Sequence, residues 1–235
     1  VIAHQTGNKD LAVDLIVRAL VINPKYAEAH YNYGIMLNEL GKIDQAAESF
    51  KNALDINPNY AEANNNLGNV FRERGELEKA ATCYHAAIAT NSAYTEAHYN
   101  LGNLYREMGK LAGSILSYRR ALELKTDYLE ACYNLGNVLN ILGKLDEAVA
   151  SYKKVLDINP NHVDAHCGLG ILYRQLGNPD EAVASYKRAV TITPLSADVY
   201  LSLGVVLRAQ EKVDEAVECF NKALEIQPNY ADAYS

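Results

Sequence analysis

Residues 129–162 read LEACYNLGNVLNILGKLDEAVASYKKVLDINPNH, and the order of apolar and small residues in this stretch decides the fold. Apolar side chains recur at helical spacing before and after Gly143, which interrupts the pattern. Pro160 ends the second run, because proline cannot continue a helix and restricts the residue before it. The stretch therefore predicts two helices joined by a short turn.

The same pattern returns every 34 residues, as two series of glycines show. One series lies within the expected first helix of each repeat and comprises Gly34, Gly68, Gly102, Gly136, Gly170 and Gly204. The other series marks the turn and comprises Gly7, Gly41, Gly75, Gly109, Gly143 and Gly177. A period of this length in a chain of 235 residues predicts an elongated array in which each repeat packs only on its neighbours.

This array is expected to fill the whole chain, residues 1–235, without a linker or a domain boundary. Full repeats are predicted at 27–60, 61–94, 95–128, 129–162, 163–196 and 197–230, with partial repeats at 1–26 and 231–235. Because the chain has no initiator Met and begins in the middle of a repeat, we expect it to be a piece of a longer protein.

Glycine inside a helix costs about 1 kcal/mol relative to alanine, so its recurrence in every first helix needs a compensating contact. We expect the second helix to approach closely at Gly68 and its equivalents, opposite a small residue such as Ala80. An aromatic side chain four residues later is expected to fill the space beside this contact, and the aromatic series is Phe50, Tyr84, Tyr118, Tyr152, Tyr186 and Phe220. These series predict helix packing rather than a cofactor site.

The composition is that of a folded protein and disfavours several classes of partner. Hydrophobic residues make up 49% and charged residues 22% of the chain, which excludes intrinsic disorder. The net charge of −7 disfavours nucleic acid and anionic membranes as partners. No apolar run approaches the ~18 residues of a membrane span, and residues 1–10 carry no secretory signal. We therefore expect an intracellular, cytoplasmic protein that could also enter the nucleus.

The repeat resembles the tetratricopeptide repeat, a helix-turn-helix unit of 34 residues. In one repeat the residues that carry the resemblance are Cys132, Leu135, Gly136, Leu139, Ala148, Tyr152 and Pro160. The tryptophan of the family pattern is replaced throughout, since the chain contains none. The resemblance implies an all-α, right-handed solenoid of antiparallel helix pairs, whose first helices line a concave groove that binds proteins or peptides.

Asparagines recur at one angle on the expected first helices, outside the apolar packing stripe. In repeat 61–94, Asn66 and Asn69 share one helix face. This asparagine ladder continues in the neighbouring repeats and comprises Asn32, Asn66, Asn69, Asn100, Asn103, Asn134 and Asn137. Gly168 and Ser202 interrupt the series. Since asparagine is a mediocre helix former, its recurrence needs an explanation.

Two compatible explanations of the ladder are open. Each side-chain amide offers two donor hydrogens and an acceptor oxygen, enough to bind the backbone of an extended peptide without reading its side chains. Alternatively, the amides bond across adjacent first helices or to helix termini. A column of arginines borders the ladder, and Arg72 and Arg106 are further binding candidates. Neighbouring carboxylates such as Glu73 and Glu107 favour exposed ion pairs for this column.

The sequence contains no catalytic or metal-binding constellation. His30, His98 and His166 align, but they lie two repeats apart, which at normal helix packing is roughly 20 Å and too far for a shared metal. Histidines in the core or at the edge of the groove are the favoured interpretation. The four cysteines, Cys83, Cys132, Cys167 and Cys219, form no CxxC pair and fit reduced thiols. We expect no metal, no cofactor and no enzymatic activity in this chain.

The ladder also resembles the superhelical repeat region of nucleocytoplasmic O-GlcNAc transferases, on the residues Asn32, Asn66, Asn100 and Asn134. That resemblance implies contacts between these asparagines and the backbone of a protein substrate. The leading hypothesis is a non-enzymatic scaffold that binds an extended peptide or a partner segment in its groove. One alternative is the substrate-selecting arm of an O-GlcNAc transferase whose catalytic domain is not in this chain. Another is head-to-tail self-association through uncapped ends, where the last second helix exposes Val217, Phe220 and Leu224.

Overall fold

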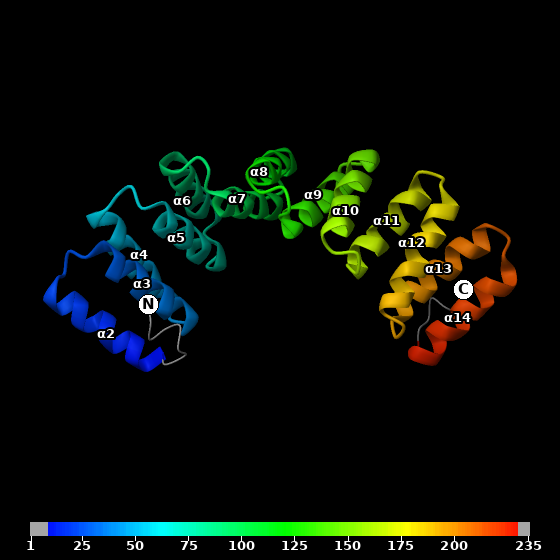
Figure 1. Cartoon of the computed structure of the whole chain (residues 1–235), viewed down its shortest axis with the longest axis horizontal. Helices are drawn as coiled ribbons and strands as arrows, with labels where there is room; N and C mark the ends of the chain where they lie inside the picture. The colour runs from blue at the N-terminus through cyan, green and yellow to red at the C-terminus, as the bar shows by residue number, and fades with distance from the viewer. Residues whose placement is uncertain (1–8, 230–235) are drawn as a thin grey trace. The chain divides into compact units, whose positions relative to one another are not determined.

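The computed structural model describes residues 9–229, and all regular secondary structure in this range is α-helical (Figure 1). The described residues form two compact units, an N-terminal unit up to Thr126 and a C-terminal unit from Asp127. The N-terminal unit contains α2 (Lys9–Ile22), α3 (Ala27–Glu39), α4 (Ile43–Ile56), α5 (Ala61–Glu73), α6 (Leu77–Thr90), α7 (Thr95–Glu107) and α8 (Leu111–Leu124). The C-terminal unit contains α9 (Leu129–Ile141), α10 (Leu145–Ile158), α11 (Val163–Gln175), α12 (Pro179–Ile192), α13 (Ala197–Ala209) and α14 (Val213–Ile226). The predicted all-α fold is therefore confirmed.

Each repeat contributes one pair of packed helices, and consecutive pairs within a unit pack on each other. In the N-terminal unit the pairs are α3–α4, α5–α6 and α7–α8, and each first helix also packs on the second helix before it. The first helices α3, α5 and α7 contact one another in sequence order, so they share one face of the unit. We call this surface the first-helix face. The expectation of one continuous array stays a prediction, and Gly7 and the partial repeat 231–235 lie outside the described residues.

The helix pairs are held by the contact that the glycine series predicted. A Cβ atom added at Gly102 would lie 2.6 Å from a ring carbon of Tyr118, and the same clash recurs at all six first-helix glycines. The ring therefore lies directly on the glycine, closer than the expected place beside it. Real Cβ contacts do not come this close, so the second helix packs here only against glycine.

The turns inside the helix pairs require a left-handed backbone conformation. Gly143 has a φ of 70° with open space where a Cβ would lie, and the equivalent glycines behave alike. In the last described repeat this position is Glu211, which adopts a φ of 62°. A residue with a Cβ pays about 1–2 kcal/mol for this conformation, whereas glycine does not. The turn geometry is thus imposed by the two helices even where glycine is missing.

Replacing Glu211 by glycine should stabilise the protein by about 0.5–1 kcal/mol, since relief of the left-handed strain exceeds the larger backbone entropy of unfolded glycine. Urea unfolding followed by circular dichroism measures the change. The matched variant Gly143→Ala should lose a similar amount, because no neighbouring atom meets the new methyl group and only φ opposes it. A destabilised Glu211→Gly protein would contradict the strain argument.

Candidate functional site

The first-helix face carries four of the predicted ladder asparagines on two adjacent helices. Asn66 and Asn69 lie one turn apart on α5 and are half-buried. Asn100 and Asn103 occupy the same positions on α7, where Asn100 is only 8% exposed. The structure therefore brings these amides together on one surface of the N-terminal unit.

The first ladder asparagine of each of these repeats, Asn66 or Asn100, bonds to a side chain of the preceding first helix. The Nδ2 of Asn66 donates to the hydroxyl of Tyr31, with 3.2 Å between the two atoms. The Nδ2 of Asn100 donates to the Oδ1 of Asn65 at 3.0 Å. Amide bonds across adjacent first helices, one of the two explanations of the ladder, are therefore confirmed for this pair.

The second ladder asparagine of a repeat bonds instead to the aromatic residue of its own second helix. The hydroxyl of Tyr84 donates to the Oδ1 of Asn69 at 2.7 Å, and that of Tyr118 donates to Asn103 at 2.6 Å. In the C-terminal unit the Tyr152 hydroxyl donates to Asn137 at 2.6 Å. These are the tyrosines that lie on the first-helix glycines, so the packing contact also reaches the candidate site.

The remaining ladder residues differ in their surroundings. Asn32, on α3, is half-buried and makes no hydrogen bond within the described part of the chain. Asn134 lies half-buried on α9 of the C-terminal unit, where its side chain has a partner. Gly168, on α11, stands where the ladder would continue, and a Cβ there would lie 2.7 Å from the ring of Tyr152. In this repeat the Tyr152 ring therefore occupies the space that the Cβ of an asparagine would need.

The two candidate arginines border the ladder at the last turns of α5 and α7. Arg72 lies 4.0 Å from the carboxylate of Glu107 in the next repeat, and both side chains are partly exposed. This is the kind of exposed ion pair that the sequence predicted for the arginine column. Arg106 is exposed and forms no ion pair among the described residues. At the opposite helix ends, Glu62 and Glu96 occupy first turns, where the helix dipole favours negative charge.

Asn65 is a site residue that sequence reasoning missed. It is fully buried, and its amide donates to Glu96 at 3.4 Å while its oxygen accepts from Asn100. The equivalent position is Tyr31 in the preceding repeat, so Asn65 takes the role of the Tyr31 hydroxyl for the next asparagine. Its only signal in the sequence is an amide in a column that otherwise holds tyrosine, cysteine or leucine.

The variant Asn65→Ala should be destabilised by about 1–3 kcal/mol, because it leaves the buried Asn100 amide without its acceptor. Thermal unfolding compared with the parent protein measures this loss. Asn64→Ala on the same helix is the matched control, since the Asn64 amide makes only a 3.4 Å bond to a backbone carbonyl and should lose less than about 1 kcal/mol. Equal losses for both variants would contradict the bridging role of Asn65.

The aligned histidines have a structural role. The Nε2 atoms of His30, His98 and His166 lie 3.0, 3.0 and 2.9 Å from the carbonyl oxygen of the residue six positions earlier. Each ring thus holds the loop that leads into its first helix, and His98 and His166 are buried. The interpretation as core histidines is confirmed for these two. Within residues 9–229 no group of three or more histidine, cysteine or acidic side chains could hold a metal ion.

Burial changes the ionisation of the tyrosines beneath the ladder. It raises the pKa of Tyr118 and of Tyr152 to about 12, from the usual 10.0, and it raises the pKa of Tyr84 as well. The neutral hydroxyl is therefore held in the folded state, where it donates to asparagine. Below pH 10 these tyrosines are neutral whether the chain is folded or unfolded. Above that pH only the unfolded chain loses its protons readily, so the folded state loses stability as the pH rises towards 12.

Alkaline unfolding should therefore begin between pH 10 and 12, together with a late rise of tyrosinate absorbance at 295 nm. The variant in which phenylalanine replaces Tyr118 and Tyr152 should lose stability at a higher pH than the parent protein does. For this comparison, the stability of each protein is expressed relative to its own value at neutral pH. Circular dichroism and absorbance recorded along the same titration test this. Unfolding at the same pH in the parent and the variant would contradict the contribution of these hydroxyls.

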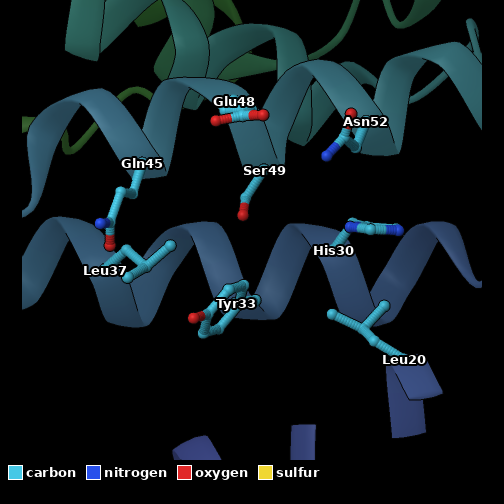
Figure 2. A pocket seen from close by; sticks show the side chains of 8 residues that line it. All are labelled: Leu20, His30, Tyr33, Leu37, Gln45, Glu48, Ser49 and Asn52. Atoms are coloured by element: carbon cyan, nitrogen blue, oxygen red, sulfur yellow. The ribbon is translucent and has the colours of Figure 1, made fainter. Parts of the chain in front are cut away.

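A pocket of about 400 Å³ lies away from the ladder, between α2, α3 and α4 (Figure 2). It is lined by Leu20, His30, Tyr33, Leu37, Gln45, Glu48, Ser49 and Asn52. One repeat later, Phe71 and Lys79 take the places of Leu37 and Gln45, and the Nζ of Lys79 lies 5.5 Å from the centre of the Phe71 ring. No ladder asparagine lines this pocket.

The four cysteines are free, and two of them, Cys83 and Cys132, are buried. Burial raises the pKa of the Cys83 and Cys167 thiols to about 11, which keeps them protonated at neutral pH. These findings agree with the prediction that the cysteines are reduced thiols. None of the helices within residues 9–229 combines the length and the apolar character that a membrane crossing needs.

The pairs of helices at a 34-residue period, with glycine under an aromatic ring in each, define a repeat protein of the helix-turn-helix class. The chain belongs to the tetratricopeptide repeat family. A family model described as TPR repeat matches residues 34–71, 68–109, 102–140 and 136–177. Further tetratricopeptide repeat models match residues 15–48 and 167–231. The family that the sequence pattern resembled is thus confirmed over most of the chain.

Solved structures of other proteins share this fold. The crystal structure of YrrB, described as a TPR protein with an unusual peptide-binding site, is 27% identical, with a TM-score of 0.72, over 80% of this chain and 97% of that chain. MamA is 27% identical, with a TM-score of 0.67, over 70% of this chain and 96% of that one. A TPR repeat-containing protein from Cytophaga hutchinsonii reaches a TM-score of 0.84 at 15% identity, over 99% of this chain and 96% of that one, and supports the fold alone. A search among curated proteins found no match.

Proposed function

We propose that this chain is a non-catalytic binding module that holds an extended segment of a partner protein against its first-helix face. The observation that carries the proposal is the set of side-chain amides that α5 and α7 bring together there. Asn66, Asn69 and Asn100 are each held by an intramolecular hydrogen bond of 2.7–3.2 Å, and each keeps hydrogen-bonding capacity beyond it.

The chemistry of these amides suits a peptide backbone. A carboxamide can form up to four hydrogen bonds, two through its nitrogen and two through its oxygen. Backbone N–H and C=O groups are present at nearly every residue of a partner, so contacts to them give affinity with little dependence on sequence. The side chains of the partner would then meet charged helix ends, acidic at Glu62 and Glu96 and basic at Arg72 and Arg106.

The family and one of its members support this role. TPR repeats form scaffolds, and all of the family models that match the chain describe such repeats. YrrB, which binds peptide at a site described as unusual, shares the fold at 27% identity. Peptide binding is therefore the function that the fold and the side-chain amides of the first-helix face support together.

A peptide selected from a random library displayed on phage, with the chain immobilised, provides the ligand for a test. Its affinity for the double variant Asn66→Ala, Asn69→Ala should fall about tenfold or more, since each lost hydrogen bond contributes about 0.5–1.5 kcal/mol. Fluorescence anisotropy of the labelled peptide measures the dissociation constant, and circular dichroism checks that the helices remain. Asn52→Ala on α4 is the matched control and should bind normally. A selected peptide that binds the double variant as tightly as the parent would contradict the proposal.

Two narrower roles stay predictions from the sequence. The substrate-selecting arm of an O-GlcNAc transferase rests on the likeness of Asn32, Asn66, Asn100 and Asn134 to that family's repeats. Head-to-tail self-association rests on the apolar residues of α14, of which Val217 is 49% exposed while Phe220 and Leu224 are half-buried. Peptide binding through the ladder is compatible with either role.

A further inference from the structure

The two ladder asparagines of repeat 61–94, Asn66 and Asn69, are oriented in opposite senses. The nitrogen of Asn66 is engaged by the Tyr31 hydroxyl, so its oxygen is the group that remains for a ligand. That oxygen has only a long contact of 3.5 Å with the Asn65 amide, which leaves a lone pair available. The oxygen of Asn69 is engaged by the Tyr84 hydroxyl at 2.7 Å, so its nitrogen is the group that remains. One repeat thus presents one acceptor and one donor.

The next repeat follows the same rule where its bonds are defined. The nitrogen of Asn100 donates to Asn65, and its oxygen has no partner in the described chain. No buried side-chain oxygen or nitrogen among the described residues lacks a partner, so the Asn100 oxygen must reach solvent even though the residue is 8% exposed. The oxygen of Asn103 is engaged by Tyr118, as Asn69 is by Tyr84.

An extended peptide backbone has the matching arrangement. The N–H and C=O of one residue point to the same side of an extended chain, which is how a residue exchanges two bonds with a neighbouring strand. Asn66 and Asn69 are one helical turn apart, where side chains are neighbours at about 5–6 Å between Cβ atoms. Their free acceptor and free donor can therefore meet the N–H and the C=O of a single residue.

We propose that Tyr84 is a positioning residue, whose hydroxyl fixes the Asn69 amide so that Asn66 and Asn69 together receive the N–H and C=O of one extended residue. This inference rests on the proposed peptide binding and names its recognition chemistry. The ligand class is an extended segment whose backbone N–H is free at that residue, which excludes proline there.

The chain itself links the tyrosine hydroxyl to the asparagine. Where the second-helix aromatic is Tyr84, Tyr118 or Tyr152, the residue one position after the first-helix glycine is asparagine. Where the aromatic is Phe50 or Phe220, that residue is Ile35 or Val205. The exception is Tyr186, which is paired with Ile171. In five of the six full repeats the hydroxyl and the asparagine are therefore either both present or both absent.

A double-mutant cycle on the phage-selected peptide tests the positioning role. Tyr84→Phe should weaken binding about three- to tenfold in the parent protein, because the Asn69 amide is free to rotate once its hydrogen bond is lost. In an Asn69→Ala background the same change should have no further effect, since Tyr84 acts only through Asn69. The natural Phe50 and Phe220 show that phenylalanine fits on the glycine, so the variant should fold.

The control variant is Tyr105→Phe, which removes a hydroxyl bonded to His85 at 2.9 Å and touches no ladder residue. It should leave peptide affinity unchanged. Replacement of single peptide amides by esters gives a second measurement, because an ester lacks the N–H. The ester replacement that weakens binding most in the parent protein should no longer weaken it when Asn66 is replaced by alanine.

The outcomes separate this inference from the proposed function. If Tyr84→Phe has no effect in the parent protein, or an equal effect with and without Asn69, the positioning role is wrong although peptide binding stands. If the double variant Asn66→Ala, Asn69→Ala binds the peptide like the parent, the proposed function itself fails. Loss of affinity that depends on Asn69, with an ester effect that depends on Asn66, supports both.

Discussion

The contact between a first-helix glycine and an aromatic ring of the second helix is the constraint on which the rest of the structure depends. At Gly68 a Cβ would lie 2.7 Å from the Tyr84 ring, so the two helices keep their separation only while this residue has no side chain. Because the contact recurs at every first-helix glycine, all the helix pairs share one geometry. Similar pairs then place α3, α5 and α7 in contact, and this creates the first-helix face.

The same contact connects the packing of the helices to the candidate site. A ring that lies on the glycine extends its hydroxyl as far as the first-helix residue that follows, where Tyr84 and Tyr118 reach Asn69 and Asn103. With phenylalanine in that place the packing is kept and the hydroxyl is lost, and the facing residue becomes aliphatic, as Ile35 does opposite Phe50. Glycine and ring are therefore required for the fold, whereas the hydroxyl serves the polar surface.

The sequence could predict those features that depend on spacing within one helix. The glycine period predicted the helix pairs, and the angle of Asn66 and Asn69 placed both on one face. Asn65 was not predicted, because its partners Glu96 and Asn100 come from the next repeat, 31 and 35 residues away. The left-handed conformation of Glu211 could not be read from its residue type either, since the flanking helices impose it.

The intramolecular bonds of the asparagines and a role in binding do not compete. A flexible side chain that becomes fixed on binding costs about 0.5–1.5 kcal/mol, and this opposes affinity. Asn66, Asn69 and Asn100 are already held by Tyr31, Tyr84 and Asn65, so that cost is met when the protein folds. Each bond uses only part of the four-bond capacity of an amide, so further hydrogen bonds can form at its other end. Under the proposed function, the two explanations of the ladder are therefore parts of one arrangement, in which the internal bonds orient the amides before a peptide backbone binds.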